Sequence, residues 1–537
     1  MITKNIIETS KYFSIKEIIE ITDSYHEYFQ ELLSLSILNP DNSYLVKKAF
    51  NASLFYKGFI MESLLNIRKA IRQSKEVAYF SERLTELNKN LDELYNSPQK
   101  DTKSIAHLQD SILSIETDMS RSIGKLRKNE EMVSWEDIQF QLADDEAGLD
   151  FLRVNIDDSK DARYIAMVLR SSSEAPIMVP LFKESDITTK FSNTATNSDL
   201  FINSLYSQDK SALYAKSSSN NFSLYNLIWK PLAGYLKGIS KISYASDGIM
   251  QNLALHAIAT DDGDILSDHF QFLQVTYLRT ITKKKISLQK SKAKKALLMG
   301  GIPYGGTLDN YNNSKDKPDE KFAKRGKQLV WNDLPQTAME VDDISGILTK
   351  SKFDLTVLKN SDANKKSLSD QFSINSNDQI IHLATHGYFE TEDFLQVKSK
   401  VEGNQSNLEL THSGIVLANA NNLPDKEGIL TAFEISQFNL ENTDLVVLSA
   451  CETGLGQIYE NEGVYGLQRA FKIAGADYII MSLWQVPDQE TRMFMNEFYK
   501  NYIEKAMPIV EAFNITQKDM RKLYSDPVKW AGFVLLQ

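Results

Sequence analysis

Two apolar stretches of the chain each run into a reactive side chain that is followed by a glycine-containing loop. The first is Ile380-Ile381-His382-Leu383-Ala384-Thr385-His386-Gly387, and the second is Val446-Val447-Leu448-Ser449-Ala450-Cys451-Glu452-Thr453-Gly454. Each stretch is typical of a buried parallel strand. Ligands of open α/β sheets bind beyond the carboxyl ends of the strands. We therefore expect His386 and Cys451 to lie at one functional edge of a sheet.

A thiol and an imidazole placed in this way favour nucleophilic catalysis. The thiolate is the reactive form of cysteine, and histidine can accept its proton and later protonate a leaving amine. The N–H groups of Gly387 and Cys451 could hold the oxyanion. His386 precedes Cys451 by 65 residues (451 − 386), which is the order and nearly the spacing of caspases. The alternative is that Cys451 is a small buried apolar residue, as many lone cysteines are.

Metal and nucleotide chemistry fit the sequence poorly. His382 and His386 are four residues apart, but on a strand this separation is about 13 Å, too far for one metal ion. We expect His382 to be a core or supporting residue. The glycine-rich stretch 300–306 lacks the Gly-Lys-Ser/Thr ending of a phosphate-binding loop. We expect no metal and no cofactor.

The amino-acid composition indicates which partners the protein binds and in which cell compartment it works. The chain has 537 residues, with 60 Lys+Arg against 71 Asp+Glu, so its formal net charge is −11. This balance argues against nucleic acid as the direct partner. The single cysteine excludes an internal disulfide and fits a reducing cytoplasm. No apolar run reaches the length of a membrane span, and no signal peptide is evident, so we expect a cytoplasmic protein without a membrane partner.

The pattern of apolar residues predicts three regions. Residues 1–140 have helical periodicity throughout, including one helix over 45–74 and a hairpin of helices over 77–95 and 103–126. Residues 141–290 and 291–537 alternate strands and helices, which predicts two α/β units. We expect an α/β fold, with a doubly wound and mostly parallel sheet that has helices on both faces, preceded by an all-α region.

The last part of the chain carries the candidates for substrate recognition. Strand 478–484 is expected to be followed by a final helix that Asp488 caps. We single out Glu452, Trp484 and Asp488 as candidate substrate-binding residues. An acidic group among them would favour a basic residue before the cleaved bond. The alternatives are a helix-capping role for Asp488 and a buried structural role for Glu452.

Several of these segments resemble the CHAT domain, a family of caspase-like cysteine peptidases related to caspases and separase. The segments that carry the resemblance are His382–Gly387, Leu448–Gly456, Leu334–Thr337 before Glu340, Ser413–Ala418, Glu462–Phe471, Ser482–Trp484 and Trp530–Val534. The resemblance spans about residues 200–537. It places the catalytic dyad at His386 and Cys451 and implies that 291–537 is the active caspase-like domain, with 141–290 a degenerate half. The helical region resembles the end of a tetratricopeptide array. The turn at Asp247-Gly248 departs from the family's usual Pro-Asp-Gly.

The resemblance also implies a biological setting. Family members are bacterial endopeptidases, some of which cleave gasdermin-like pore formers while others act beside CRISPR effectors. The resemblance therefore implies a protein substrate, such as a gasdermin-like or other protein encoded nearby, and a role in regulated proteolysis or defence. A partner protein is expected to activate the enzyme, with the polar loops 307–328 and 391–408 becoming ordered or being self-cleaved. The competing hypothesis is a catalytically silent scaffold that binds partners through its helical region.

Overall fold

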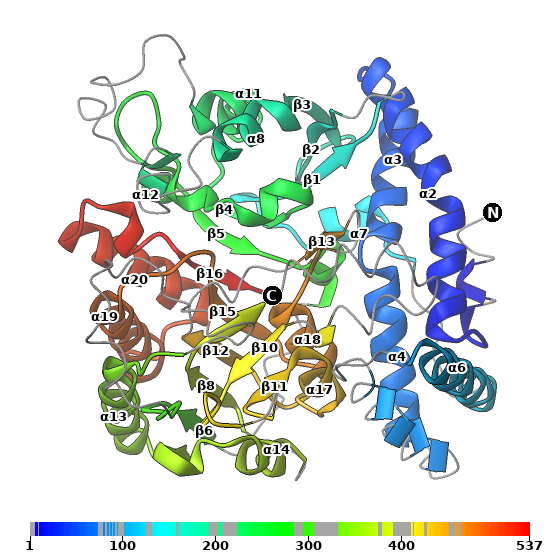
Figure 1. Cartoon of the computed structure of the whole chain (residues 1–537). Coiled ribbons are helices and arrows are strands. Elements are labelled where there is room, and N and C mark those ends of the chain that lie inside the picture. Colours follow the sequence, from blue (N-terminus) through cyan, green and yellow to red (C-terminus); the bar gives the residue numbers. More distant parts are fainter. Residues whose placement is uncertain are drawn as a thin grey trace.

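The computed structural model describes most of the chain, and everything below concerns this described part. It comprises residues 6–8, 10–73, 79–80, 83–84, 86–87, 90–91, 94, 101–124, 132–156, 161–192, 202–203, 205–206, 223–283, 294–305, 331–373, 378–389, 410–411, 413–423, 427–449, 457–459 and 463–537. A group of helices from the N-terminal region stands on one side of a large α/β body (Figure 1).

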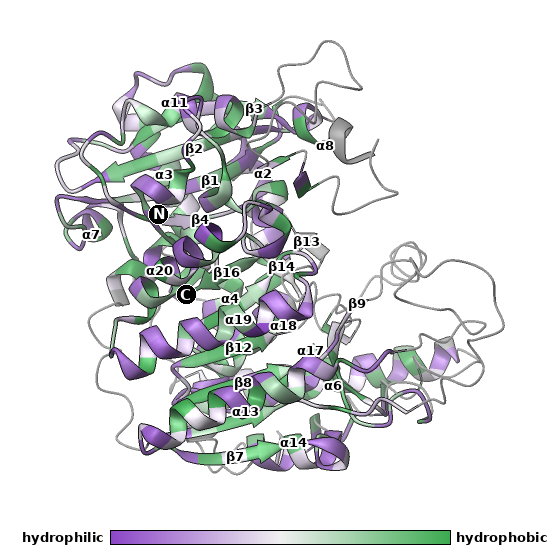
Figure 2. Ribbon diagram, turned by 90° about the vertical axis from the view of Figure 1, so that its left-hand side faces the viewer, coloured by the Kyte–Doolittle hydropathy of each residue, from purple (hydrophilic) through white to green (hydrophobic). Residues whose placement is uncertain are grey.

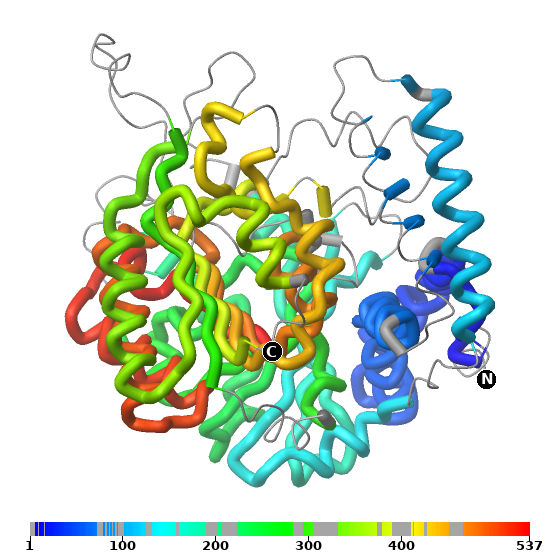
Figure 3. Tube along the Cα trace, turned by 90° about the horizontal axis from the view of Figure 1, so that it is seen from below, coloured from blue at the N-terminus to red at the C-terminus, as the bar shows by residue number. Residues whose placement is uncertain are grey.

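The N-terminal region is helical, as expected. Its long helices are α2 (Ile15–Leu38), α3 (Ser43–Tyr56), α4 (Phe59–Gln73) and α6 (Thr102–Ile123). Seen from below, they lie together at one edge of the molecule (Figure 3). The helix expected over 103–126 is confirmed as α6. Much of the expected helix 77–95 lies outside the described residues.

The single helix expected over 45–74 is wrong, because the chain breaks between α3 and α4. Gly58 has φ +90°, a conformation that side chains disfavour. A Cβ atom at this position would come within 2.3 Å of the Tyr277 ring. The aromatic side chain of a distant segment therefore occupies the space at the break, and helical periodicity does not reveal it.

One sheet of eleven strands runs through the whole α/β body. Its order is β3 (Ile177–Lys183), β2 (Arg163–Arg170), β1 (Glu146–Val154), β4 (Lys241–Ala245), β5 (Gln271–Gln274), β16 (Phe533–Leu536), β15 (Tyr478–Ser482), β12 (Leu445–Ser449), β8 (Ile380–Ala384), β6 (Lys295–Met299) and β7 (Asp354–Leu358). Only the pairs β1/β2, β2/β3 and β15/β16 of this sheet are antiparallel. The mostly parallel sheet that the sequence predicts is confirmed.

Helices cover both faces of the second half of the sheet, as expected. Figure 1 shows α13 (Pro335–Lys350), α19 (Asp488–Tyr499) and α20 (Ile509–Leu523) on one side of β15, β12 and β8. On the other side lie α17 (Ala432–Gln437) and α18 (Leu467–Ala474). The strands between them are mainly apolar (Figure 2), with His382 the polar exception at the centre of β8. Every residue of β8 and β12 is buried. Burial on both faces explains why these strands lack the alternation of half-exposed strands.

Shorter elements complete the fold. The helical ones are α7 (Trp135–Gln139), α8 (Glu184–Ser192), η2 (Tyr225–Trp229), α11 (Lys230–Ala233), η3 (Gly248–Asn252), η4 (Leu255–Ala257), α12 (Leu266–His269), η5 (Leu278–Lys283), η8 (Asn360–Asp362), α14 (Lys365–Ser373), η9 (Lys500–Glu504) and η10 (Pro527–Lys529). Two small sheets flank the large one. They consist of β9 (Gly387–Phe389), β10 (Ser413–Val416) and β11 (Ile429–Thr431), and of β13 (Gln457–Tyr459) and β14 (Gly463–Tyr465).

The C-terminal strand joins the two halves of the sheet. The helix at Asp488 was expected to be the last element, but α20 and β16 follow it. β16 lies antiparallel to β15 and pairs with β5 through Leu536 and Gln274. The proposed units 141–290 and 291–537 therefore share one continuous sheet. Their division into a degenerate half and an active peptidase domain stays a prediction.

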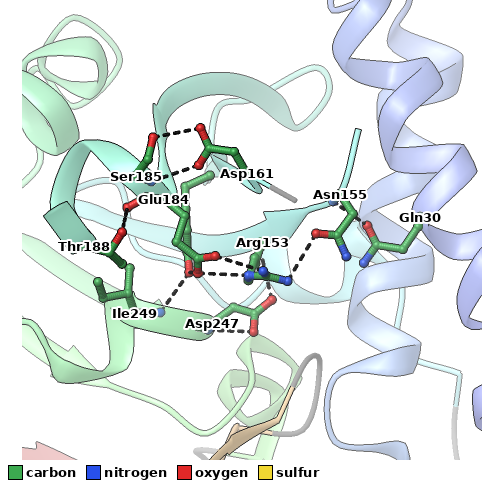
Figure 4. A network of polar contacts seen from close by, with 11 residues as sticks. Gln30, Arg153, Asn155, Asp161, Glu184, Ser185, Thr188, Asp247 and Ile249 are labelled. Atoms are coloured by element: carbon green, nitrogen blue, oxygen red, sulfur yellow. Dashed lines mark hydrogen bonds and ion pairs between the residues drawn. The ribbon is translucent and has the colours of Figure 1, made fainter. Parts of the chain in front are cut away.

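Polar contacts attach the helical region to β1 (Figure 4). Arg153 is bound to both carboxylate oxygens of Glu184, at 3.0 and 2.9 Å, and its Nη1 donates to Asn155. The main-chain N–H of Asn155 donates to Gln30 of α2 at 3.1 Å, and that of Arg153 donates to Asp247. The network thus connects α2, β1 and the turn after β4.

Candidate active site

The strands that lead to the predicted dyad are neighbours, and their ends are level. β8 and β12 are parallel, and their register pairs Leu383 with Leu448 and Ala384 with Ser449. In the sequence, His386 follows Ala384 by two residues and Cys451 follows Ser449 by two residues. The two chain segments that carry the dyad therefore leave the same edge of the sheet side by side.

His386 packs against two aromatic rings. Its imidazole lies 4.9 Å from the ring of Tyr304 and 5.4 Å from that of Trp331, measured between centroids. Its Nε2 atom lies 2.7 Å from the main-chain oxygen of Asn332. A carbonyl oxygen can only accept, so Nε2 carries the hydrogen, and in the neutral imidazole the lone pair is on Nδ1.

Burial sets the protonation state of His386. It disfavours the charged imidazolium and so lowers the pKa of His386 below its ordinary value of 6.5. The bond to Asn332 and the charges of Asp488 and Asp333 oppose this effect but do not overcome it. At neutral pH, His386 is accordingly a proton acceptor at Nδ1.

Gly387 turns its N–H away from the neighbouring strand. It begins β9, an edge strand that pairs with β10 in antiparallel register. The Val416 N–H donates to the His386 carbonyl, so residues 386 and 416 form a hydrogen-bonded pair. Such pairs alternate with non-hydrogen-bonded ones, and Gly387, opposite Ile415, belongs to the second kind. Its N–H therefore points to the outer edge of β9.

Cys451 and Glu452 lie outside the described residues, together with the rest of segment 450–456. The structure describes the end of β12 at Ser449 and resumes at Gln457, where β13 begins. The positions of the thiol and of the Glu452 carboxylate thus stay predictions.

A small pocket opens beside the strand ends. It has a volume of about 20 Å³, room for roughly one water molecule. The ends of β8, β12 and β15 meet α13 and α19 there, and the polar lining residues are Gln336, Thr337, Glu340, Thr385, Ser449, Ser482, Asp488 and Thr491. Two of them, Glu340 and Asp488, are acidic.

The remaining candidates for substrate recognition differ in their surroundings. Asp488 is the first residue of α19, which Pro487 precedes at the N-cap without a capping side chain, so the expected capping role of Asp488 is wrong. Trp484 is only 8% exposed, and its indole N–H donates to the Val528 carbonyl at 3.2 Å. Among the described residues that line the pocket, Trp484 does not occur. Asp488 is therefore the better-placed candidate.

His382 lies in the core. Its Nε2 is 2.8 Å from Oε1 of Glu340, and its Nδ1 is 3.3 Å from the hydroxyl of Tyr499. Its side chain is fully buried, which agrees with the supporting role expected for it. In the described part of the chain, no group of three His, Cys, Asp or Glu side chains could hold a metal ion.

Sequence reasoning did not find the residues that surround His386. Tyr304 and Trp331 flank a polar stretch of the sequence and Asn332 acts through its main chain, so no side-chain motif marks them. The only available signal was an aromatic residue at each end of that stretch, which is too common to be specific.

The fold and the site together define an α/β protein with a histidine and a cysteine predicted at adjacent strand ends. The chain belongs to the CHAT domain family, whose model matches residues 222–537. This match covers more than half of the chain and confirms the resemblance that the motifs indicated.

Curated relatives match only a short part. The chain is 34% identical over 116 residues to Tetratricopeptide repeat protein 28 of Mus musculus and of Homo sapiens. The match covers 21% of this chain and only 5% and 4% of those proteins, so the chain spans a small fraction of their length.

Two solved structures resemble this chain with low sequence identity and low TM-scores. The Arg-specific cysteine proteinase gingipain R has 11% identity and a TM-score of 0.35, covering 57% of this chain and 65% of that one. The Saccharomyces cerevisiae separase in complex with securin has 9% identity and a TM-score of 0.41. The match covers 97% of this chain and 44% of the separase chain. In the described residues, membrane-spanning helices are absent, since none is both long and apolar enough.

Proposed function

We propose that the protein is a cysteine endopeptidase in which Cys451 is the nucleophile and His386 the general base and acid. The register of β8 and β12, which pairs Ala384 with Ser449, is the observation that carries the proposal, because His386 and Cys451 each follow two residues later in the sequence. Membership in the CHAT family supports it.

In the proposed reaction, Nδ1 of His386 takes the proton of the Cys451 thiol. The thiolate sulfur attacks the carbonyl carbon of the scissile peptide, and the electron pair of the carbonyl moves to its oxygen. The imidazolium then protonates the leaving amine as the C–N bond breaks. Water, deprotonated at Nδ1, attacks the thioester and releases the thiolate. Nε2–H stays bound to the Asn332 carbonyl throughout, which keeps the ring in one tautomer.

The proposed oxyanion hole consists of the N–H groups of Gly387 and Cys451. The direction of the Gly387 N–H, away from β10, supports this role. One such donor is worth about 2.7–4 kcal/mol of transition-state stabilisation.

Substrate recognition is proposed to use Asp488 beside the strand ends; the pocket as it stands has room for about one water molecule, so a substrate side chain would have to widen it. Asp488 lines it, which favours a basic residue before the cleaved bond. Glu452 and Trp484 stay candidates for contacts to the substrate. The substrate is proposed to be a protein, for example a gasdermin-like protein encoded nearby, and the setting a bacterial cytoplasm with an activating partner.

The test compares wild type with Cys451→Ala and His386→Gln. Each protein is co-expressed with its genomic neighbours, and new N-termini are mapped by mass spectrometry. We expect cleavage by the wild type alone. If the wild type cleaves nothing, alkylation by a peptide chloromethylketone with arginine at its reactive end becomes the deciding measurement. Cys451 labelling that needs His386 supports a peptidase awaiting its activator, and no labelling supports the scaffold hypothesis.

A further inference from the structure

We propose that Asn421 is a positioning residue for His386. This inference rests on the proposed function for its consequences in catalysis, but its structural part concerns the imidazole alone. Asn421 lies in the turn that follows β10, 35 residues beyond His386 in the sequence (421 − 386). No motif of the sequence marks it.

The side chain of Asn421 makes two hydrogen bonds to the main chain of Trp331, an arrangement called the Asn421 clamp below. Its Oδ1 accepts a hydrogen bond from the Trp331 N–H at 2.8 Å, and its Nδ2 donates to the Trp331 carbonyl, also at 2.8 Å. An amide is the side chain that can accept and donate side by side in this way. The two bonds fix both the position and the orientation of the Trp331 backbone.

The main chain of Asn421 binds Tyr304, the second aromatic residue beside His386. Its N–H donates to the carbonyl of Tyr304 at 2.8 Å, and the N–H of Asn419 donates to the carbonyl of Pro303 at 2.9 Å. The turn is thus attached to segment 303–304. Asn421 therefore bonds the main chains of both aromatic residues that pack against the imidazole of His386.

The clamp acts on His386 through the next residue along the chain. Asn332 follows Trp331, and its carbonyl is the partner of Nε2. A second contact closes the arrangement, since the Tyr304 hydroxyl lies 2.9 Å from Oγ1 of Thr385, the residue before His386. Asn421 thereby positions the acceptor that selects the tautomer and the two aromatic residues that pack against the imidazole.

A purely structural role for Asn421 would affect stability without changing the imidazole. The experiment must therefore observe His386 directly. The protein is labelled with ¹⁵N-histidine, and the nitrogen chemical shifts and long-range couplings report the tautomer and titration of each ring. The chain has seven histidines, and His386 is assigned by the signal that disappears in His386→Gln.

Asn421→Ala is compared with Asn422→Ala. Asn422 is the matched control, because its exposed amide donates locally, to Asn419, and bonds neither Trp331 nor Tyr304 among the described residues. In the wild type and the control, we expect the Nε2–H tautomer and a titration midpoint below 6.5. In Asn421→Ala, we expect both tautomers and a midpoint closer to 6.5, because water reaches the ring. If Asn421→Ala does not fold, Asn421→Gln, which keeps the amide but displaces it by one methylene, replaces it with the same expectation.

A second readout links the clamp to catalysis. Cys451 is the only thiol of the chain, so the rate of its alkylation by iodoacetamide is read from the intact mass. We expect Asn421→Ala to lower this rate at pH 7 by about tenfold or more, within the range that a misplaced acid–base group costs.

The two proposals fail in different ways. A folded Asn421→Ala or Asn421→Gln protein with the wild-type tautomer and midpoint would overturn the positioning role, whatever its reactivity. An altered tautomer combined with alkylation rates equal in wild type, Asn421→Ala and His386→Gln would support the positioning role and contradict the proposed dyad.

Discussion

Oε1 of Glu340 lies 2.8 Å from Nε2 of His382, with the two side chains only 2% and 0% exposed. Glu340 comes from α13, and His382 is the central residue of β8. The contact therefore fixes the helix against the strand that carries His386 four residues later.

Removing one partner of this contact should destabilise the fold. We expect Glu340→Leu to lower the free energy of unfolding by about 1–3 kcal/mol, because His382 keeps a buried polar group without its partner. Urea unfolding measures the change. Asp342→Ala on the same helix is the control, since its bond to Lys359 joins a largely exposed carboxylate and should be worth at most about 1 kcal/mol. Equal losses in both variants would contradict the importance of the buried contact.

The reactivity of Cys451 should follow the lowered pKa of His386. The neutral imidazole is the proton acceptor, so the alkylation rate should persist below pH 6.5 and fall only as the pH drops through the lowered pKa. The negative charge of Asp488 raises that pKa, so Asp488→Asn should shift the fall to still lower pH. A pH profile of iodoacetamide alkylation measures both midpoints, and a shift to higher pH would count against this electrostatic role.

Asp488→Asn should also change specificity. Removing the carboxylate from the pocket should reduce the preference for a basic over a neutral residue before the cleaved bond by roughly tenfold, because one charged hydrogen bond is lost. Competing chloromethylketone probes with arginine or leucine at the reactive end measure the ratio. Asp519→Asn, on an exposed face of α20, is the control and should leave it unchanged. An unaltered ratio in Asp488→Asn would assign recognition to another residue.

A buried histidine at the junction of the two halves should make stability depend on pH. Burial lowers the pKa of His256 from 6.5 to about 4, and Nε2 of His256 faces the donating amide of Gln517 at 2.9 Å. The unfolded chain binds this proton near pH 6.5 and the folded protein only near pH 4. Stability from this group is thus full above pH 6.5 and declines as the pH falls to about 4.

The expected loss over that window is about 3 kcal/mol, following 1.36 kcal/mol per pKa unit. Urea unfolding at several pH values measures it in wild type and in His256→Asn, which keeps a donor and an acceptor but does not titrate. We expect a flatter pH dependence in the variant. Parallel curves would show that other groups cause the loss.

Gly58 should tolerate no side chain. In Gly58→Ala, the Cβ atom would meet the Tyr277 ring at φ +90°, so we expect a loss of about 2 kcal/mol or more in unfolding free energy. Gly234 is the matched control, because it has φ −63° and nothing lies within 4 Å of an added Cβ atom. Gly234→Ala should be neutral or stabilising by about 0.4–1 kcal/mol. Thermal and urea unfolding would contradict the argument if the two variants behaved alike.

Local patterns were sufficient for the elements that carry the dyad. The apolar runs before His386 and Cys451 predicted β8 and β12, because strands buried on both faces consist mostly of apolar residues. The reactive residues were found because they interrupt those runs at the strand ends. The mostly parallel sheet followed from the alternation of strands and helices.

Only the tertiary structure decided what surrounds His386 and how the halves join. Asn332 is 54 residues before His386, and Asn421 is 90 residues beyond Trp331. Leu536 pairs with Gln274 from the other half of the sheet. Periodicity reports which face of an element is buried, but not which distant segment covers it. Main-chain partners such as the Asn332 carbonyl are present at every residue, so only folding selects the one that binds the imidazole.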